Sequence, residues 1–403
     1  MRSEEHSAWE RDFPVRYLLV RENYDEDNGR TGSLWGRCAE AEGLFMDPPP
    51  LPREILTLRG CPRDSVLARA VTRSTDPVRV LGDMDLVIHP ADPSSDGPHR
   101  FWVLADTTVL AHRPTPGDPE RVDLTVGAGI KEDIYWGCKQ LPSSPQFELW
   151  ANSLVPNGPV GCCLSIDGLF SPRPQQPAQP LHLIGCEPAE PLLAELRSPR
   201  SADDEVIELW SLDHNCRQMA QYDFDFRATE VRPSVLGGAL VDITVADPGE
   251  DRPWLAGRPT LAARDVRDVW YDGVPTRRNL WAPFDERGRK EWHNLCSIGP
   301  YGPGVGSSGG TYHLDGQYAT ERAGLLLALG EALIGPGGTY GHGLDSVKDH
   351  LGGGPSVFSP FTLVWHHADI ARAALAHDPD PRGSFFEQTV GLLRRYGVTV
   401  VLR

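Results

Sequence analysis

The sequence predicts a multidomain protein with two repeated β-rich modules followed by a C-terminal α/β domain, in which helices cover a small parallel sheet. Three observations lead to this fold class. The chain has 403 residues, enough for more than one hydrophobic core. Segments of its first 250 residues match one another at a nearly constant separation. After a glycine-rich stretch, the short apolar runs typical of strands alternate with longer helical patterns.

Three pairs of matching segments indicate an internal duplication. They are GRCAEAEGLF and GCCLSIDGLF (36–45 and 161–170), LTLRGC and LHLIGC (56–61 and 181–186), and VDLTV and VDITV (122–126 and 241–245). The first two pairs share one separation of 125 residues, and the third pair has a slightly shorter one. This shared register predicts two copies of one module, at roughly 14–130 and 143–248. We assign residues 1–135 to module A and residues 136–248 to module B.

Each module is expected to be rich in β-strands. Short apolar runs such as residues 206–212 are separated by clusters of proline, glycine and aspartate. Four cysteines occupy equivalent positions in the two copies, Cys38 with Cys163 and Cys61 with Cys186. We expect these cysteines to be buried core residues, with a disulfide inside each copy as the alternative.

Residues 249–310 form a predicted connector that is rich in tryptophan and ends in a glycine-rich linker. We expect its aromatic residues to pack between modules, with an exposed adhesive patch as the alternative: Trp270, Tyr271, Trp281 and Trp292. The end of the connector, GPGVGSSGG, has the composition of a flexible linker. It contains a formal G-x-G-x-x-G, but an extended pattern follows it where a helix is required, so we expect no dinucleotide site.

The last part of the chain, residues 311–403, has a regular succession of strand and helix patterns. The predicted order is strand 311–316, helices 319–334 and 344–351, strand 358–366, helices 368–377 and 384–397, and strand 398–403. Strands that are separated by helices in this way are typical of a small parallel sheet covered by helices.

The predicted helix 344–351, LDSVKDHL, has two different faces. Its apolar residues recur at helical spacing and are expected to face the core: Leu344, Val347 and Leu351. Asp345 and Asp349 lie one turn apart on the opposite face, beside Lys348. Two like charges at this spacing cost an isolated helix about 0.2–0.5 kcal/mol, so they favour a role other than stability. A favourable contact of Asp345 with the helix dipole, and simple solvation of Asp349, are the alternatives.

The segment 311–403 resembles the barstar family of intracellular ribonuclease inhibitors. The resemblance rests on Tyr340-Gly341, on Asp345 and Asp349 at their helical spacing, on the buried strand that follows, and on a last helix that ends in glycine before an apolar strand. It implies that the loop and second helix enter the active site of a secreted nuclease, where acidic side chains stand in for RNA phosphates. It also implies that Tyr340, Gly341, Asp345 and Asp349 are docking residues. Packing of Tyr340 across the loop is the alternative for that residue.

Three positions depart from the family pattern. Gly343 stands where the family has asparagine, Lys348 where it has an exposed tryptophan, and Leu392 near an acidic position of the last helix. With these departures included, the predicted partner-binding residues of this chain are Tyr340, Gly341, His342, Asp345, Lys348 and Asp349.

Charge and hydropathy limit the functional classes. The net charge of −17 argues against direct binding of nucleic acid and fits a basic protein partner, although acidic solvation would look the same. No apolar run reaches the roughly 18 residues of a membrane-spanning helix. No signal-peptide pattern is present at the start, so we expect a cytoplasmic protein with no membrane contact.

We expect no cofactor, no metal and no enzymatic activity, because no catalytic constellation is found. The chain has no C-x-x-C pair, and His342, His366 and His367 lack the spacing of metal ligands on one helix. The resulting hypothesis is an immunity protein that binds a basic, extracellular-type ribonuclease and occludes its active site. The alternative is a non-inhibitory scaffold in which the barstar-like domain binds another protein partner.

Overall fold

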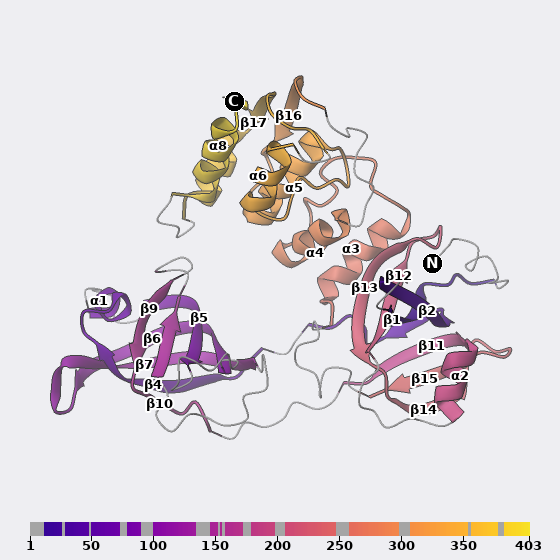
Figure 1. The fold of residues 1–403 in the computed structure, drawn as a ribbon, viewed down its shortest axis with the longest axis horizontal. Coiled ribbons are helices and arrows are strands. Elements are labelled where there is room, and N and C mark those ends of the chain that lie inside the picture. Colours follow the sequence, from indigo (N-terminus) through magenta and orange to yellow (C-terminus); the bar gives the residue numbers. More distant parts are fainter. Residues whose placement is uncertain are drawn as a thin grey trace. The chain divides into compact units, whose positions relative to one another are not determined.

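The computed structural model describes most of the chain and groups it into two compact units. The described segments are residues 12–25, 29–47, 50–72, 79–89, 100–133, 146–151, 154, 158–171, 179–197, 206–246, 258–297, 307–353, 356–377 and 383–403. The first unit comprises residues 1–47, 177–377 and 384–403, and the second comprises residues 48–176 and 378–383. Each unit contains a curled antiparallel sheet, and the first also contains a parallel sheet with helices (Figure 1).

The antiparallel sheet of the first unit combines strands from two distant parts of the chain. Three strands precede residue 48: β1 (Tyr17–Asp25), β2 (Gly29–Cys38) and β3 (Glu40–Glu42). Five strands follow residue 180: β11 (Leu181–Pro188), β12 (Val206–Leu212), β13 (Gln218–Asp225), β14 (Ala228–Pro233) and β15 (Val241–Val245). The strand order is β13-β12-β1-β2-β11-β15-β14, with β3 also paired to β11. Helix α2 (Glu190–Arg197) contacts β2 and β11.

The antiparallel sheet of the second unit is formed by one continuous part of the chain. Its strands are β4 (Arg53–Pro62), β5 (Arg79–His89), β6 (Arg100–Thr115), β7 (Asp118–Asp133), β8 (Gln146–Trp150), β9 (Pro159–Cys163) and β10 (Ser165–Asp167). Their order is β10-β4-β7-β6-β5-β8-β9. Helix α1 (Val66–Thr72) contacts β6 and β9. Alternate residues of these strands are buried, as Leu56 and Leu58 are on β4, which explains the alternating sequence pattern.

The predicted modules A and B each contribute strands to both sheets. Module A supplies β1–β3 to the first unit and β4–β7 to the second. Module B supplies β8–β10 to the second unit and β11–β15 to the first. We call this arrangement the strand exchange. The sequence analysis places the two modules one after the other and contains no sign of it.

The strand pairings of the two sheets keep corresponding registers. In the first unit Glu40 of β3 lies opposite Ile184 of β11. In the second unit Ser165 of β10 lies opposite Arg59 of β4. Glu40 and Ser165 differ by 125 positions, and so do Arg59 and Ile184, which is the separation of the matching sequence segments. Each sheet therefore pairs the early strands of one module with the late strands of the other.

The four equivalent cysteines are buried free thiols, as expected. Each thiol interacts with a thiol of the other module, Cys61 with Cys163 and Cys38 with Cys186. A hydrogen bond with Cys61, together with burial, raises the pKa of Cys163, and burial together with a hydrogen bond to Cys38 raises the pKa of Cys186. The alternative of a disulfide inside each copy is therefore wrong for this structure.

A buried aspartate occupies the same place in each sheet. Asp123 of β7 accepts a hydrogen bond of 3.0 Å from the N–H of Gly60, and Asp242 of β15 accepts one of 3.0 Å from the N–H of Gly185. Both glycines have positive φ, 68° and 63°, a conformation that other residues rarely adopt. Burial alone would raise the pKa of each carboxyl group, but these and further hydrogen bonds lower it.

The C-terminal domain has the predicted order of elements. Its parallel sheet consists of β16 (Thr311–Asp315), β17 (Thr362–His366) and β18 (Thr399–Leu402), in that order. Its helices are α5 (Arg322–Leu333), α6 (Leu344–Leu351), α7 (Ala368–Ala374), a 3-10 turn (Leu375–His377) and α8 (Phe385–Arg395). The prediction of a small parallel sheet with helices is confirmed.

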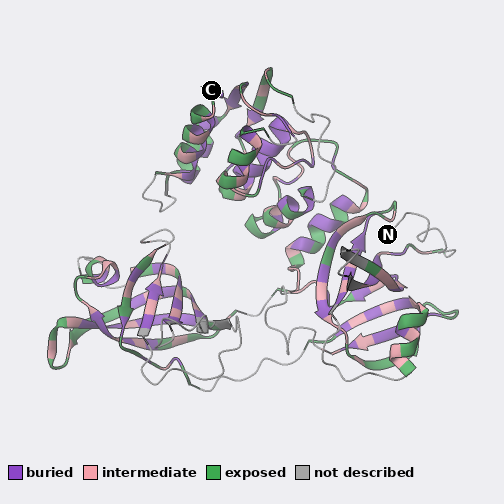
Figure 2. Ribbon diagram, viewed as in Figure 1, coloured by how far each residue is buried: buried purple, intermediate pink, exposed green. Residues whose placement is uncertain are grey.

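The tryptophan-rich connector is part of this domain. Its described residues form α3 (Leu261–Tyr271) and α4 (Glu286–Cys296). Trp270, Trp281 and Trp292 are buried in the same hydrophobic core as the residues of α5 and the parallel sheet. Burial of these three side chains, and not an exposed patch, is therefore confirmed, but they pack in the core of this domain. Helix α5 is buried from Gly324 to Leu333, and Glu331 is the only charged side chain in that stretch, whereas α6 and α8 have one exposed face (Figure 2).

Candidate functional site

Helix α6 and the loop before it carry all the predicted partner-binding residues. The loop packs closely on α5, because a side chain at Gly330 would lie 2.4 Å from the carbonyl oxygen of Gly338. Gly341 turns the chain into α6 with a φ of 111°. Val347 and Leu351 are buried and Leu344 is half-buried, as the helical spacing predicts. This packing holds the polar face of α6 toward solvent.

Two of the six predicted residues lie inside the protein. Tyr340 has no exposed surface, its hydroxyl donates a hydrogen bond to the carbonyl of Val357, and its ring lies 5.0 Å from that of His350. Gly341 is buried as well. Tyr340 is therefore a core residue of the loop in this structure and not a surface anchor. The docking role of Tyr340 was implied by the resemblance, and its burial agrees with the alternative that it packs across the loop.

The other four residues, His342, Asp345, Lys348 and Asp349, are exposed. Asp345 lies in the first turn of α6 and Asp349 one turn later. Neither carboxylate forms an ion pair or hydrogen bond with the residues that the structure describes. Their negative charges are therefore available to a partner, with the ammonium of Lys348 on the same exposed surface.

Helix α4 supplies residues to this site that the sequence analysis missed. The ring of His342 stacks on that of His293, with 4.4 Å between centroids, and the His342 side chain hydrogen-bonds Ser297. Nε2 of His293 lies 3.1 Å from the carbonyl oxygen of Gly341 and 3.0 Å from the hydroxyl of Thr339. Burial and the neighbouring His342 lower the pKa of His293 to about 4. The connector thus covers the loop side of the predicted surface and leaves the α6 side open.

A second polar cluster lies at the carboxyl ends of the parallel strands. The rings of His313 and His366 stack and are joined by a 2.9 Å hydrogen bond, and His367 lies 3.2 Å from Asp315. Asn279, which precedes α4, donates a 2.9 Å hydrogen bond to Asp315. Within the described segments no group of three or more histidine, cysteine, aspartate or glutamate residues has the arrangement of a metal site.

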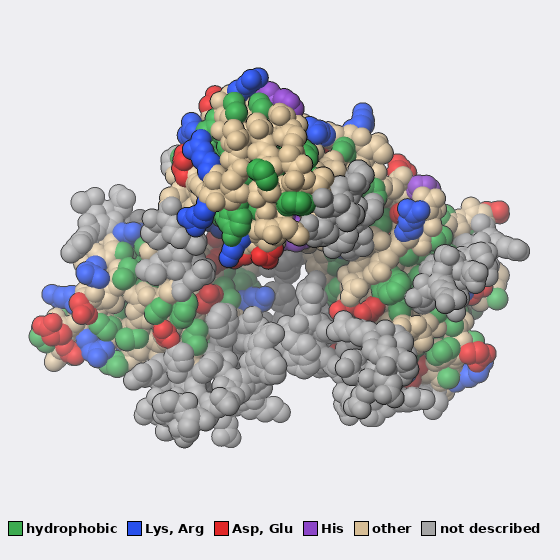
Figure 3. Space-filling view, turned by 45° about the horizontal axis from the view of Figure 1, so that its top comes forward, with side chains coloured by type: hydrophobic (Ala, Val, Ile, Leu, Met, Phe, Trp, Pro, Cys, Tyr) green, Lys and Arg blue, Asp and Glu red, His purple; other side chains and the backbone are tan. Residues whose placement is uncertain are grey.

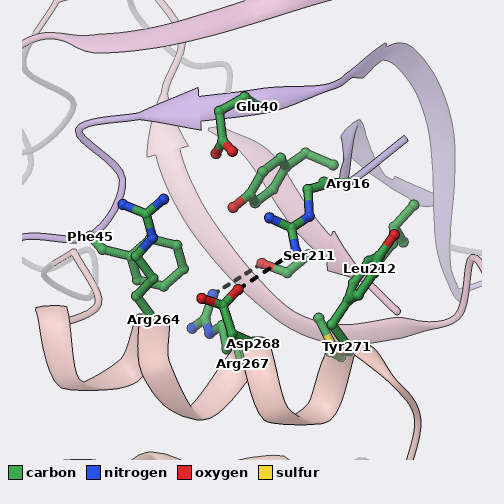
Figure 4. A pocket seen from close by; sticks show the side chains of 11 residues that line it. Arg16, Glu40, Phe45, Ser211, Leu212, Arg264, Arg267, Asp268 and Tyr271 are labelled. Carbon is green, nitrogen blue, oxygen red and sulfur yellow. Dashed lines mark hydrogen bonds and ion pairs between the residues drawn. The ribbon is translucent and has the colours of Figure 1, made fainter. Parts of the chain in front are cut away.

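A pocket in the first unit lies between the antiparallel sheet and α3 (Figure 4). Its cavity volume is only about 20 Å³, and it is partly open to solvent. Its charged lining residues come from the start of the chain and from α3: Arg16, Glu40, Arg264, Arg267 and Asp268. The sequence analysis did not find this pocket, because more than 200 residues separate the two segments and neither contains a recognisable motif.

No protein-family model, no curated protein and no solved structure matches the chain. Among the described helices, none combines the length and apolar character needed to cross a membrane.

Proposed function

We propose that the C-terminal domain is a barstar-like binding module that occludes the active site of a basic, secreted ribonuclease. The observation that carries this proposal is the exposed and unpaired state of Asp345 and Asp349 on α6, among the residues that the structure describes. The element order β-α-α-β-α-α-β and the resemblance along residues 311–403 support it.

Under this proposal a few charged side chains on α6, and not a uniformly acidic face, recognise the ribonuclease. Side chains of both signs lie on the visible face of the C-terminal domain (Figure 3). A ribonuclease active site gathers cationic groups to hold phosphate. Aspartates that enter such a site form charge-assisted hydrogen bonds away from water. Close charge pairs of this kind have coupling energies of about 1.5–7 kcal/mol, a range measured on a barstar complex.

The test is inhibition of a panel of small basic ribonucleases by the full chain. We expect Asp345→Asn plus Asp349→Asn to weaken inhibition of the responsive enzyme by about a hundredfold or more, because two pairs of at least about 1.5 kcal/mol are lost. Asp369→Asn is the matched control, since Asp369 is also exposed and lies in the first turn of α7. Equal inhibition by the double variant and this control would reject the site.

A scaffold function is the second candidate, and the position of α4 favours it. His342 stacks on the buried His293 of α4, so α4 already covers part of the loop that the resemblance assigns to nuclease docking. A scaffold partner would bind the α6 face without blocking any nuclease. Under this alternative no ribonuclease of the panel is inhibited. A protein that is affinity-purified with the full chain no longer binds when Asp345 and Asp349 are both replaced by asparagine.

We also propose that modules A and B arose by duplication of one unit that exchanges its first three strands. The matching registers at Glu40–Ile184 and Ser165–Arg59 support this origin. The buried aspartates give further support, because they occupy the same place in the two sheets. Asp123 accepts a hydrogen bond from the N–H of Gly60, and Asp242 accepts one from the N–H of Gly185. Under this proposal the two sheets are two copies of one binding or scaffolding unit.

A further inference from the structure

Four buried cysteines form one pair in each antiparallel sheet. Cys38 and Cys186 lie in the hydrophobic core beside the sheet of the first unit, and Cys61 and Cys163 lie in that of the second. No more than 3% of any of these residues is exposed. The two members of each pair are more than 100 positions apart in the sequence, and one comes from module A and the other from module B.

In the first unit the strand register places Cys38 directly opposite Cys186. Ile184 of β11 pairs with Glu40 of β3, and three positions further along β11 the partner is Arg37 of β2. Both pairings follow one antiparallel register, and the two cysteines lie between them at matching positions. Strands β2 and β3 of module A therefore bring one thiol, and β11 of module B brings the other.

The second unit repeats this placement with Cys61 and Cys163. Ser165 of β10 pairs with Arg59 of β4, and the N–H of Leu164 donates a 2.8 Å hydrogen bond to the carbonyl of Arg59. Two positions further along in the same register, Cys61 lies opposite Cys163 of β9, a strand that is in contact with β4. The two cysteine pairs thus occupy equivalent places in the two sheets.

This placement suits a disulfide in both sheets. Directly opposite residues of antiparallel strands have Cα atoms about 4.5–5.5 Å apart. Disulfides join cysteines whose Cα atoms are about 4.4–6.8 Å apart, so no backbone movement is required. The thiols of each pair also interact with one another, Cys61 with Cys163 and Cys38 with Cys186, so their sulfur atoms are already neighbours.

We propose that each cysteine pair is an oxidation site that forms a disulfide between module A and module B. Glutathione disulfide is a sufficient oxidant. The thiolate of one cysteine attacks a sulfur of glutathione disulfide, which gives a mixed disulfide and releases one glutathione thiolate. The second cysteine loses its proton and attacks the protein sulfur of the mixed disulfide, which releases the second glutathione thiolate. Two protein thiols are thereby oxidised to one disulfide, and glutathione disulfide is reduced to two glutathione molecules, which take up the two protons.

The burial of the pairs determines when this exchange can occur. A hydrogen bond with Cys61, and then burial, raise the pKa of Cys163, and burial raises the pKa of Cys186. Because the thiolate is the nucleophile, protonated thiols inside a closed core exchange slowly. The disulfides therefore form while the sheets fold, and the closed core then protects them from reductants. They would fix the strand exchange covalently in both sheets. This inference does not depend on the proposed nuclease inhibition.

The experiment is refolding of the unfolded, reduced full chain in a mixture of glutathione disulfide and glutathione. Remaining thiols are then alkylated, and non-reduced peptides are identified by mass spectrometry. Four cysteines can form two disulfides in three ways, and only one of them matches the strand register. We expect this pairing alone, Cys38 with Cys186 and Cys61 with Cys163.

Cys296 is the matched control, because it is buried as well and its ionisable neighbour is Glu331 and not a thiol. It should be recovered in the alkylated form. The oxidised chain should melt about 5 °C or more above the chain refolded in dithiothreitol, because each disulfide closes a long loop of the unfolded chain. Cys163→Ala and Cys186→Ala should each remove one disulfide and part of this rise.

Two results would overturn the proposal. One is any other pairing of the four cysteines, for example Cys38 with Cys61, which would join thiols of a single module. The other is a chain that melts cooperatively after refolding in glutathione disulfide while all four thiols are recovered in the alkylated form. The cooperative transition shows in that case that the chain has folded, so the absence of disulfides cannot be attributed to a failure to fold.

Discussion

His293 is a single buried residue that joins α4 to the loop before α6. Only 5% of it is exposed, and its Nε2 lies within hydrogen-bond distance of the Gly341 carbonyl. A carbonyl oxygen can only accept, so Nε2 carries the proton in the neutral ring. The neighbouring imidazole of His342 makes a second positive charge at this place unfavourable.

This environment makes the stability of the C-terminal domain depend on pH. Burial and His342 lower the pKa of His293 from an ordinary 6.5 to about 4 in the folded chain. The unfolded chain therefore takes up a proton first as the pH falls. The contribution of His293 is fully present above about pH 6.5 and is lost toward pH 4, and it amounts to roughly 3 kcal/mol at most.

Urea unfolding of the wild type and of His293→Gln at pH 7 and pH 4.5 checks this prediction. We expect the free energy of unfolding to fall less between these two pH values in the variant, because glutamine does not titrate. If the free energy of unfolding fell by the same amount in both proteins, groups other than His293 would cause the loss of stability at low pH.

At the scale of elements, glycines on both sides allow the close contact between α5 and the following loop, and Gly330 is the one inside the helix. A Cβ atom at Gly330 would lie 2.4 Å from the Gly338 carbonyl oxygen and 3.0 Å from Cα of Thr339. Both neighbours are backbone atoms, so the loop itself would have to move. That loop leads directly into α6 and sets the position of its exposed aspartates.

We expect Gly330→Ala to destabilise the chain by about 1–3 kcal/mol, as overpacking of a core does. Gly391→Ala is the matched control, because Gly391 also lies inside a helix, α8, but has open space around its Cβ position. Alanine at that position should leave stability unchanged or raise it by up to about 1 kcal/mol. Thermal unfolding of the two variants measures both effects, and equal melting temperatures would contradict the close approach.

At the scale of the whole molecule, the strand exchange decides which pieces of the chain can fold. All seven strands of the second unit, β4–β10, lie within residues 48–176. The predicted module A, residues 1–135, contains β1–β3 without β11 and β12, their partners in the first unit. It also lacks β8 and β10, which pair with β5 and β4.

A fragment of residues 48–176 should therefore unfold cooperatively on heating, with a circular dichroism spectrum typical of β-sheet. A fragment of residues 1–135 should not, because it exposes the edges of β4 and β5 and leaves the first three strands without a sheet. If the fragment 1–135 unfolded cooperatively and the fragment 48–176 were disordered, each module would fold as a separate domain, and the strand exchange would be contradicted.

Much of the C-terminal domain could be predicted because its signals are local. Helical spacing in LDSVKDHL identifies the buried side of α6, and short apolar runs identify β16, β17 and β18. The exposure of Asp345 and Asp349 follows from the same spacing. The environment of Tyr340 could not be predicted, since it depends on how the loop folds back over Val357 and His350.

The sequence by itself determined the order of strands and helices in the C-terminal domain and the polar face of α6, because helical spacing and short apolar runs act along the chain. Only the tertiary structure decided that residues 1–135 and residues 136–248 each supply strands to both antiparallel sheets, that α4 covers one side of the loop, and that α3 lies beside Arg16 and Tyr17. Those arrangements bring together residues far apart in sequence, and no local preference specifies them. Each depends on which apolar surfaces bury one another when the whole chain folds.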